Sequence, residues 1–240
     1  RAFGARIFNQ DQKDDSAAKY INSPETIVYT KGQHLYGFDL AKDAISHNDY
    51  VIIVEGYADC VIPYQAGINN IVASLGTALT VEQIRLLRRY TKNIVMLFDA
   101  DNAGESAMIR SLDTLLEEGM NIKIAQLNEG EDPDSFVRKY GADSFRQRVN
   151  EAKNIFDFKL EVLSKKYDLK TIEGKVRISS EMLATINKFS NAVFRSGYLR
   201  RLSKAIDIPE QALISELKKL NLEYKDNEDD YRKSSNKIVT

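Results

Sequence analysis

The sequence holds a single cysteine, Cys60, and only two histidines, His34 and His47. One cysteine excludes a disulfide within the chain and a structural zinc site of the four-cysteine type. Two histidines also make a histidine-rich metal site a poor fit. A bound metal would therefore be held by carboxylates, which favour a hard cation such as Mg²⁺, and we expect no zinc in this chain. The low cysteine content is typical of a reducing, cytoplasmic setting.

Long apolar runs are missing as well. No stretch approaches the ~20 apolar residues of a membrane-spanning helix, and nothing resembles a signal peptide, so we expect no membrane partner. A basic excess is missing too, because 34 Lys and Arg residues face 35 Asp and Glu residues. Composition alone therefore argues weakly against a nucleic-acid partner. The first residue is Arg rather than Met, which indicates a piece of a longer protein.

Short apolar runs alternate with helical patterns over residues 36–142. This alternation predicts βαβ units and a mostly parallel sheet that is buried on both faces, which is an α/β fold. We expect strands at 51–56, 70–74, 93–98 and 121–127. We expect helices at 36–47, 58–66, from the N-cap Thr80, at 104–118, and from Ser135.

The remaining segments follow other patterns. Residues 1–35 are rich in loops, with one short strand expected at 26–29. Apolar residues at helical spacing predict an all-α subdomain over 143–224, with no strand, and with Pro209 at a first helical position. The polar, charged segment 225–240 is typical of a disordered linker.

Three acidic clusters follow three of the predicted strands. Glu55 closes the run VIIVE, Asp99 and Asp101 close NIVMLFDAD, and Asp132 and Asp134 lie in the loop GEDPD. Ligands of an open α/β sheet bind beyond the carboxyl ends of its strands. If these strands are neighbours in one parallel sheet, the three clusters face one crevice.

Crowded carboxylates raise one another's pKa when they lie within ~4–6 Å, and a divalent cation removes this repulsion. Mg²⁺ commonly uses one or two carboxylates together with water and substrate phosphates. Two such ions can clamp the attacking and leaving oxygens of a phosphoryl transfer. The three clusters together therefore favour a metal site.

Each cluster also has a simpler interpretation. Asp99 and Asp101 alone fit a solvated turn, and Asp132 and Asp134 fit the N-terminal cap of a helix. Asp59 lies four residues after Glu55, so it either points at the same crevice or is a first-turn acid favoured by the helix dipole. The residues by themselves leave these alternatives open.

Three cations, Arg6, Lys19 and Lys31, lie in the loop-rich first segment. They fit contacts to phosphates of a triphosphate or a nucleic acid. They fit equally well as isolated cations on a solvated surface.

Two long motifs resemble a known family. EGYADCVIPYQAGINNIVASLGTALT followed by FDADNAG is similar to the Toprim domain of primases, topoisomerases and some nucleases. The segments KYINSPET, KGQHLYG, SLGTALT and GEDPDSFV narrow the resemblance to the bacterial replicative DNA primases of the DnaG type. A topoisomerase or nuclease of the Toprim class is the alternative, although GEDPD and KYINSPET are not expected in a topoisomerase.

The resemblance implies a Toprim domain and part of an RNA polymerase core, which makes short RNA primers on single-stranded DNA from ribonucleoside triphosphates. It implies a nucleotidyltransferase that uses Mg²⁺ or Mn²⁺, acts in DNA replication and works as a monomer. The metal-binding acids of the family match Glu55, Asp59, Asp99, Asp101, Asp132 and Asp134. Of these acids, Glu55, Asp99 and Asp101 are the catalytic candidates, and Glu55 is either a ligand or the proton acceptor.

The resemblance also implies residues that bind substrate or nucleic acid, and these match Arg6, Lys19, Asn22 and Lys31. It divides the chain into the end of an N-terminal core subdomain (1–35), the Toprim domain (36–142), the helical subdomain (143–224) and the linker (225–240). A domain that contacts the replicative helicase is expected only beyond the linker, so we expect it to be absent from this chain.

Overall fold

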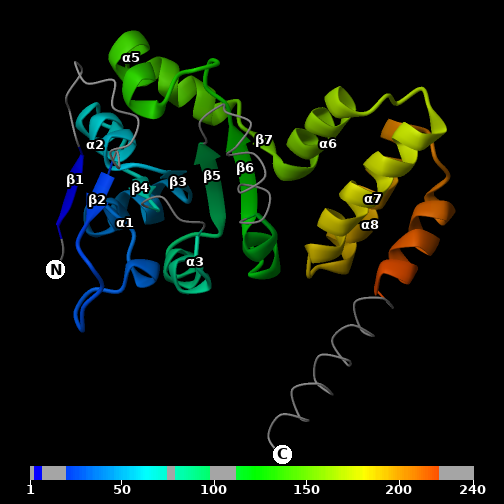
Figure 1. Ribbon diagram of the computed structural model, residues 1–240, viewed down its shortest axis with the longest axis horizontal. Helices are drawn as coiled ribbons and strands as arrows, with labels where there is room; N and C mark the ends of the chain where they lie inside the picture. Colours follow the sequence, from blue (N-terminus) through cyan, green and yellow to red (C-terminus); the bar gives the residue numbers. More distant parts are fainter. Residues whose placement is uncertain (1–2, 7–19, 75–78, 98–111, 222–240) are drawn as a thin grey trace, which may run out of the picture.

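A computed structural model describes residues 3–6, 20–74, 79–97 and 112–221 of the 240-residue chain. A sheet with helices on both faces forms one part, and a bundle of helices lies beside it (Figure 1). None of the described helices is both long and apolar enough to cross a membrane.

The strands and helices lie close to the expected ranges. The strands are β1 (Gly4–Arg6), β2 (Tyr20–Asn22), β3 (Val51–Val54), β4 (Ile71–Ala73), β5 (Asn93–Leu97), β6 (Asn121–Ala125) and β7 (Lys153–Asn154). The helices are α1 (Phe38–Asn48), α2 (Tyr57–Gln65), α3 (Val81–Arg88), α5 (Pro133–Asn150), α6 (Ile155–Lys166), α7 (Ile172–Lys188) and α8 (Ala192–Ile206), with a 3₁₀ turn η1 (Lys31–Gln33). Residues 112–117 and 210–221 are also helical.

The main sheet has five strands in the order β4-β3-β5-β6-β7. Strands β4, β3, β5 and β6 are parallel, as the alternating pattern predicts, and β7 pairs with β6 in the antiparallel sense. The carboxyl ends of β3, β5 and β6 therefore lie side by side at one edge. Strands β1 and β2 form a separate antiparallel pair.

Both faces of the sheet are buried along β3 and β4, which carry apolar residues at every position. In β3, Val51 and Ile53 join the core under α1, α3 and the helical residues 112–117. Ile52 and Val54 join the opposite core under α2 and α5. This alternation follows from the two-residue repeat of a strand.

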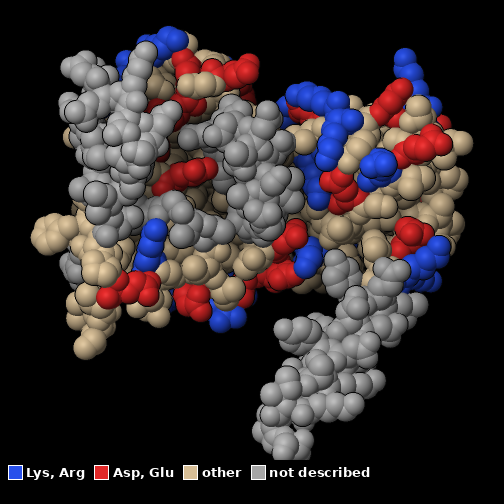
Figure 2. All heavy atoms as spheres, viewed as in Figure 1, with Lys and Arg blue, Asp and Glu red and all other residues tan. Residues whose placement is uncertain are grey.

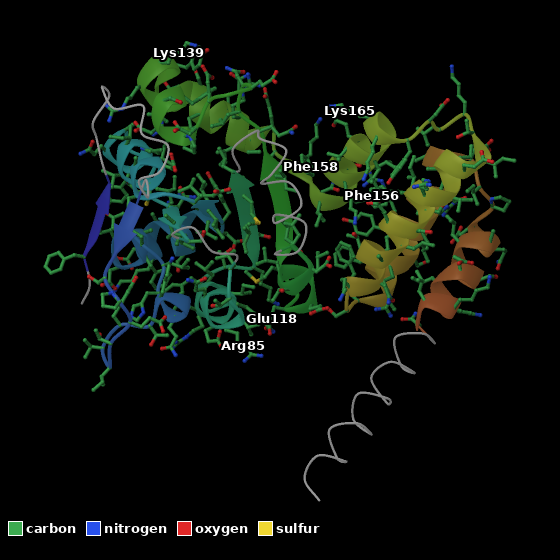
Figure 3. The ribbon with its side chains drawn as sticks, viewed as in Figure 1. Arg85, Glu118, Lys139, Phe156, Phe158 and Lys165 are labelled. Carbon is green, nitrogen blue, oxygen red and sulfur yellow. The ribbon has the colours of Figure 1, made fainter. Side chains whose placement is uncertain are left out.

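The helical bundle has its own core, and α6 connects it to the sheet. Phe156 packs with α7 and α8, whereas Phe158, two residues later, packs in a core of the sheet. The two labelled rings lie on different sides of α6 in Figure 3. Lys188 on α7 and Glu117 form an ion pair at 2.5 Å that also joins the bundle to the sheet.

Local sequence signals explain where several helices begin. Thr80 caps α3 as predicted, because its side chain accepts a hydrogen bond from the backbone N–H of Gln83 at 3.1 Å. Helix α5 begins at Pro133, two residues before the predicted Ser135. The last helical stretch begins at residue 210, directly after Pro209.

Two findings differ from the expectations. Residues 26–29 form a turn closed by one bridge between Thr26 and Tyr29, rather than a strand. Strand β7 lies in the region where no strand was expected, because a two-residue strand leaves no periodic signal in the sequence. The predicted boundary between the Toprim and helical parts, after residue 142, stays a prediction; α5 is divided close to it, because Gly141 has a non-helical backbone with φ 82°. The expected linker at 225–240 lies outside the described residues.

Candidate metal centre at the carboxyl end of the sheet

Two of the three acidic clusters lie at one edge of the sheet in the described structure. Glu55 directly follows β3, and the loop with Asp132 follows β6, one strand beyond β5. Asp99 and Asp101 would follow β5, the strand between them, but both lie outside the described residues. The condition that the three strands are parallel neighbours is therefore met.

Glu55 and Asp59 have different surroundings. Glu55 is exposed between β3 and α2. Asp59 is buried in the first turn of α2, where its Oδ2 accepts a hydrogen bond from the backbone N–H of Gly56 at 3.1 Å. This bond belongs to the capping interpretation of Asp59, because it satisfies a donor at the start of the helix. Of these two acids, the exposed Glu55 is the one that solvent reaches readily.

The loop after β6 ends in the N-terminal cap of α5. Asp132 Oδ1 accepts a hydrogen bond from the backbone N–H of Ser135 at 2.8 Å, and Pro133 occupies the first helical position. Asp134 lies in the first turn and forms an ion pair with Arg138. The helix-capping interpretation of this pair is thus confirmed.

The described residues alone do not assemble a metal cage. No group of three or more His, Cys, Asp or Glu side chains in residues 3–6, 20–74, 79–97 and 112–221 is arranged to hold one ion. A site at this edge would need Asp99 or Asp101 in addition to Glu55 and the loop before α5. The metal-ligand set stays a prediction.

The predicted nucleic-acid-binding residues fall in three places. Arg6 and Asn22 lie on the paired strands β1 and β2, where Gly4 is opposite Asn22. Lys19 lies outside the described residues. Lys31 begins the 3₁₀ turn η1, and this turn is held against α3.

A buried glutamine on α3 holds this turn in place, and sequence reasoning missed its role. Gln83 is fully buried, and its Nε2 donates to the carbonyl oxygens of Lys31 at 3.2 Å and His34 at 2.7 Å. The Thr80 hydroxyl donates to the carbonyl oxygen of Gly32. The T-x-x-Q spacing predicts only the local cap. Nothing in the sequence marks a contact across about fifty positions.

Known proteins resemble this chain in sequence and structure. A DNA primase from Clostridium acetobutylicum is 42% identical over 212 residues, which cover 88% of this chain and 34% of that protein. A solved structure of the DnaG catalytic core has 35% identity and a TM-score of 0.75. The match covers 89% of this chain and 68% of the chain in that structure. A DnaG catalytic domain bound to single-stranded DNA has 35% identity and a TM-score of 0.76, over 88% and 66% of the two chains.

Family models agree with these likenesses. Residues 52–137 match the Toprim-like model, and the chain thus contains a Toprim domain, as its sheet and helices indicate. Residues 1–42 match the model of the N-terminal domain of the DNA primase catalytic core. Together with the likeness to the DnaG core, these matches show that the chain belongs to the bacterial DnaG-type DNA primases. The chain spans about a third of the length of the curated primases that it matches.

A third family model changes one expectation. Residues 156–211 match the model described as the DnaB-helicase binding domain of primase. These residues span α6, α7 and α8. The expectation that every helicase-binding segment lies beyond the linker is therefore corrected, because a segment with that description lies in the helical bundle. The apolar spacing of the bundle predicted helices but carried no signal for a partner.

Proposed function

We propose that this chain is the metal-binding part of a primase that makes short RNA primers on single-stranded DNA from ribonucleoside triphosphates. One observation carries the proposal. Three parallel neighbours, β3, β5 and β6, end at the same edge of a Toprim sheet, and an acidic cluster follows each of them in the sequence. Membership of the DnaG-type primases supports the same reaction.

The donor set at this edge fits Mg²⁺ or Mn²⁺, because it consists of carboxylate oxygens. The residues that would hold the cations are Glu55, Asp59, Asp99, Asp101, Asp132 and Asp134. Three of these acids have partners in the described structure, since Asp59 bonds to Gly56, Asp132 to Ser135 and Asp134 to Arg138. We assign the catalytic roles to Glu55, Asp99 and Asp101, because they match the Glu-Gly and Asp-x-Asp signatures of the Toprim domain.

Bound cations of this kind supply a lower pKa for an attacking hydroxyl and neutralise a leaving pyrophosphate. The protein supplies the negative charge of the carboxylate ligands and holds them in position. The cap of α5 fixes the backbone at Asp132, and the short step from β3 to α2 fixes Glu55. Glu55 is either a ligand or the acceptor of the proton from the attacking hydroxyl.

Four residues are assigned to substrate or template phosphates, namely Arg6, Lys19, Asn22 and Lys31. A related DnaG catalytic domain binds single-stranded DNA, which supports a template contact in this chain too. Lys31 suits the role best among the described residues, because Gln83 bonds to its carbonyl oxygen and Thr80 bonds to that of the next residue, Gly32. Figure 2 shows both signs of charge interspersed over the visible face of the bundle, so we place the template near the sheet rather than there.

We assign a helicase contact to residues 156–211 on the strength of the family model that matches them. The protein then acts in DNA replication, in the cytoplasm, as a monomer next to a replicative helicase. Binding of the helicase to variants with substitutions on exposed positions of α7 and α8 tests this assignment separately from catalysis.

Substitution of both central aspartates tests the catalytic proposal. In the full-length protein, Asp99→Asn with Asp101→Asn is expected to lower primer synthesis about 100-fold or more, because metal-assisted charge stabilisation contributes several kcal/mol. Asp143→Asn is the control, since the Asp143 side chain is 99% exposed and forms an ion pair with Arg146 one turn along the helix. Primer synthesis at the control level in the double variant would contradict the proposal.

A further inference from the structure

Glu131 precedes Asp132 in the loop GEDPD, and its carboxylate is held by three side chains. Its Oε1 accepts hydrogen bonds from Lys139 Nζ at 2.8 Å and from the Tyr140 hydroxyl at 3.0 Å. Its Oε2 accepts from Asn128 Nδ2 at 2.8 Å. Lys139 and Tyr140 lie two turns into α5, and Figure 3 labels Lys139 there. One carboxylate therefore joins the loop to the helix that follows it.

The same connection reaches further along α5. Asn128 Oδ1 accepts a hydrogen bond from Arg148 Nη2 at 3.0 Å. The backbone N–H of Glu131 donates to the carbonyl oxygen of Asn128 at 3.1 Å, which closes the turn between them. Gly141 has a non-helical backbone (φ 82°) and divides α5 into two helical segments. The loop before Asp132 is thus tied to both segments, to the first at residues 139 and 140 and to the second at residue 148.

The geometry assigns Glu131 a role different from that of a metal ligand. Only 14% of its side chain is exposed, whereas the Lys139 side chain is 62% exposed. Because both carboxylate oxygens already accept side-chain hydrogen bonds, Glu131 is engaged with an ammonium group, a hydroxyl group and an amide of the protein itself.

Loss of the bonds to Glu131 would affect a neighbouring cation site through the loop. It would release the loop backbone, so that Asp132 would have to be ordered again when a cation binds. Residues that orient metal ligands in this way change metal affinity by about 10–100-fold when they are substituted.

We propose that Glu131 is a positioning residue for the metal site of this protein. Its bonds to Lys139, Tyr140 and Asn128 hold the loop so that Asp132 is presented at the carboxyl edge of the sheet, while Glu131 itself binds no metal. This inference rests on the proposed function, and it adds to it a residue that acts through Asp132.

The test measures Mg²⁺ dependence in the full-length protein. Glu131→Ala is expected to raise the Mg²⁺ concentration for half-maximal primer synthesis about 10-fold, and to leave the rate at saturating Mg²⁺ within about twofold of wild type. Mn²⁺ binding, followed by electron paramagnetic resonance without substrate, is expected to weaken by a similar factor. Glu131→Gln should recover part of the loss, because its amide oxygen still accepts from Lys139 and Tyr140.

Glu161→Ala is the matched control. Glu161 also bridges two lysines, Lys153 and Lys165, but it lies on α6, away from the loop. It is expected to leave Mg²⁺ dependence and Mn²⁺ binding unchanged. Lys139→Met removes the other partner of the Glu131–Lys139 ion pair. Because the Lys139 side chain is largely exposed, this variant should fold. It should reproduce the shift of Glu131→Ala, and the double variant should show less than the product of the two effects.

The outcomes separate the two proposals. Wild-type protein that makes primers, with Mg²⁺ dependence unchanged in Glu131→Ala and Lys139→Met, would overturn the inference and leave the proposed function standing. An equal loss of rate at every Mg²⁺ concentration, with unchanged Mn²⁺ binding, would also overturn it, because that is a purely structural effect. Wild-type protein that neither binds Mn²⁺ nor makes primers would overturn the proposed function and this inference with it.

Discussion

The side-chain amide of Gln83 donates a hydrogen bond of 2.7 Å to the carbonyl oxygen of His34, forty-nine positions earlier in the chain. The same amide bonds to the carbonyl oxygen of Lys31. A single buried side chain thus fixes the segment that carries Lys31 to the helix that follows β4. The position of this cation relative to the Toprim sheet depends on α3.

Gln83→Leu is expected to lower the free energy of unfolding by about 1–3 kcal/mol. Leucine preserves much of the volume but leaves the carbonyl oxygens of Lys31 and His34 without their donor in a buried site. Urea unfolding followed by circular dichroism measures the change. Gln147→Leu is the control, because Gln147 is exposed and its side chain bonds to Glu151 on the surface of the same helix, and it is expected to stay within about 0.5 kcal/mol of wild type. Equal stability of the two variants would contradict the role of Gln83.

Substitutions of Asp132 can separate its role as a helix cap from its proposed role as a metal ligand. Asparagine caps helices as well as aspartate does, so Asp132→Asn should keep the stability of wild type while weakening Mn²⁺ binding. Asp132→Ala should weaken Mn²⁺ binding as well and also lower the free energy of unfolding by about 1 kcal/mol. Calorimetric Mn²⁺ titration and urea unfolding supply the two readings. Wild-type Mn²⁺ affinity in Asp132→Asn would remove Asp132 from the ligand set and leave only the cap.

The two neighbouring rings on α6 belong to different cores, and this predicts two different patterns of destabilisation. Phe156→Ala and Phe158→Ala should each cost about 3–5 kcal/mol, because both rings are buried. Hydrogen exchange should show faster opening of α7 and α8 in Phe156→Ala, and of the sheet in Phe158→Ala. Phe194→Ala, at a ring that is 53% exposed, is the control and should have little effect. Identical exchange patterns in the two core variants would show that the bundle and the sheet unfold as one unit.

Asp113 should make stability depend on pH. Burial raises the pKa of this carboxyl group, and Lys188 and Lys159 oppose that effect only partly. A raised pKa in the folded state gives stability that is present below the unfolded value of about 3.9 and is lost as the pH rises through the folded value. Asp113→Asn keeps the group neutral, so its free energy of unfolding relative to wild type should rise with pH across this window and then level off. A difference that stays constant from pH 3 to pH 7 would contradict the raised pKa.

The sequence predicts most of the sheet, because its signals are local. Runs such as VIIV at 51–54 are apolar at every position, and only a strand buried on both faces needs that pattern. Thr80 and Asp132 indicate where their helices begin, because each side chain caps the helix by accepting a hydrogen bond from the backbone N–H three residues later. The parallel order of β3, β5 and β6 follows from the crossover helices between them.

The features that escaped prediction depend on contacts between distant residues or on very short elements. The sequence predicts only a helix-capping role for Gln83, yet its side chain donates hydrogen bonds to backbone carbonyl oxygens of residues far away in the chain. Glu131 reads as one more acid in GEDPD, and only its neighbours Lys139 and Asn128 distinguish it from Asp132. The ligand roles of Glu55, Asp99 and Asp101 stay predictions, since two of these residues lie outside the described chain.

Anomalous diffraction from crystals of this chain soaked in Mn²⁺ tests the central claim most directly. The account predicts at least one Mn²⁺ peak at the carboxyl edge of the sheet, within ligand distance of Asp99 or Asp101 and close to Glu55 or Asp132. Asp99→Asn with Asp101→Asn should abolish that peak while the sheet remains intact. Mn²⁺ bound elsewhere, with no peak at this edge in well-ordered wild-type crystals, would contradict a metal centre built from these acids.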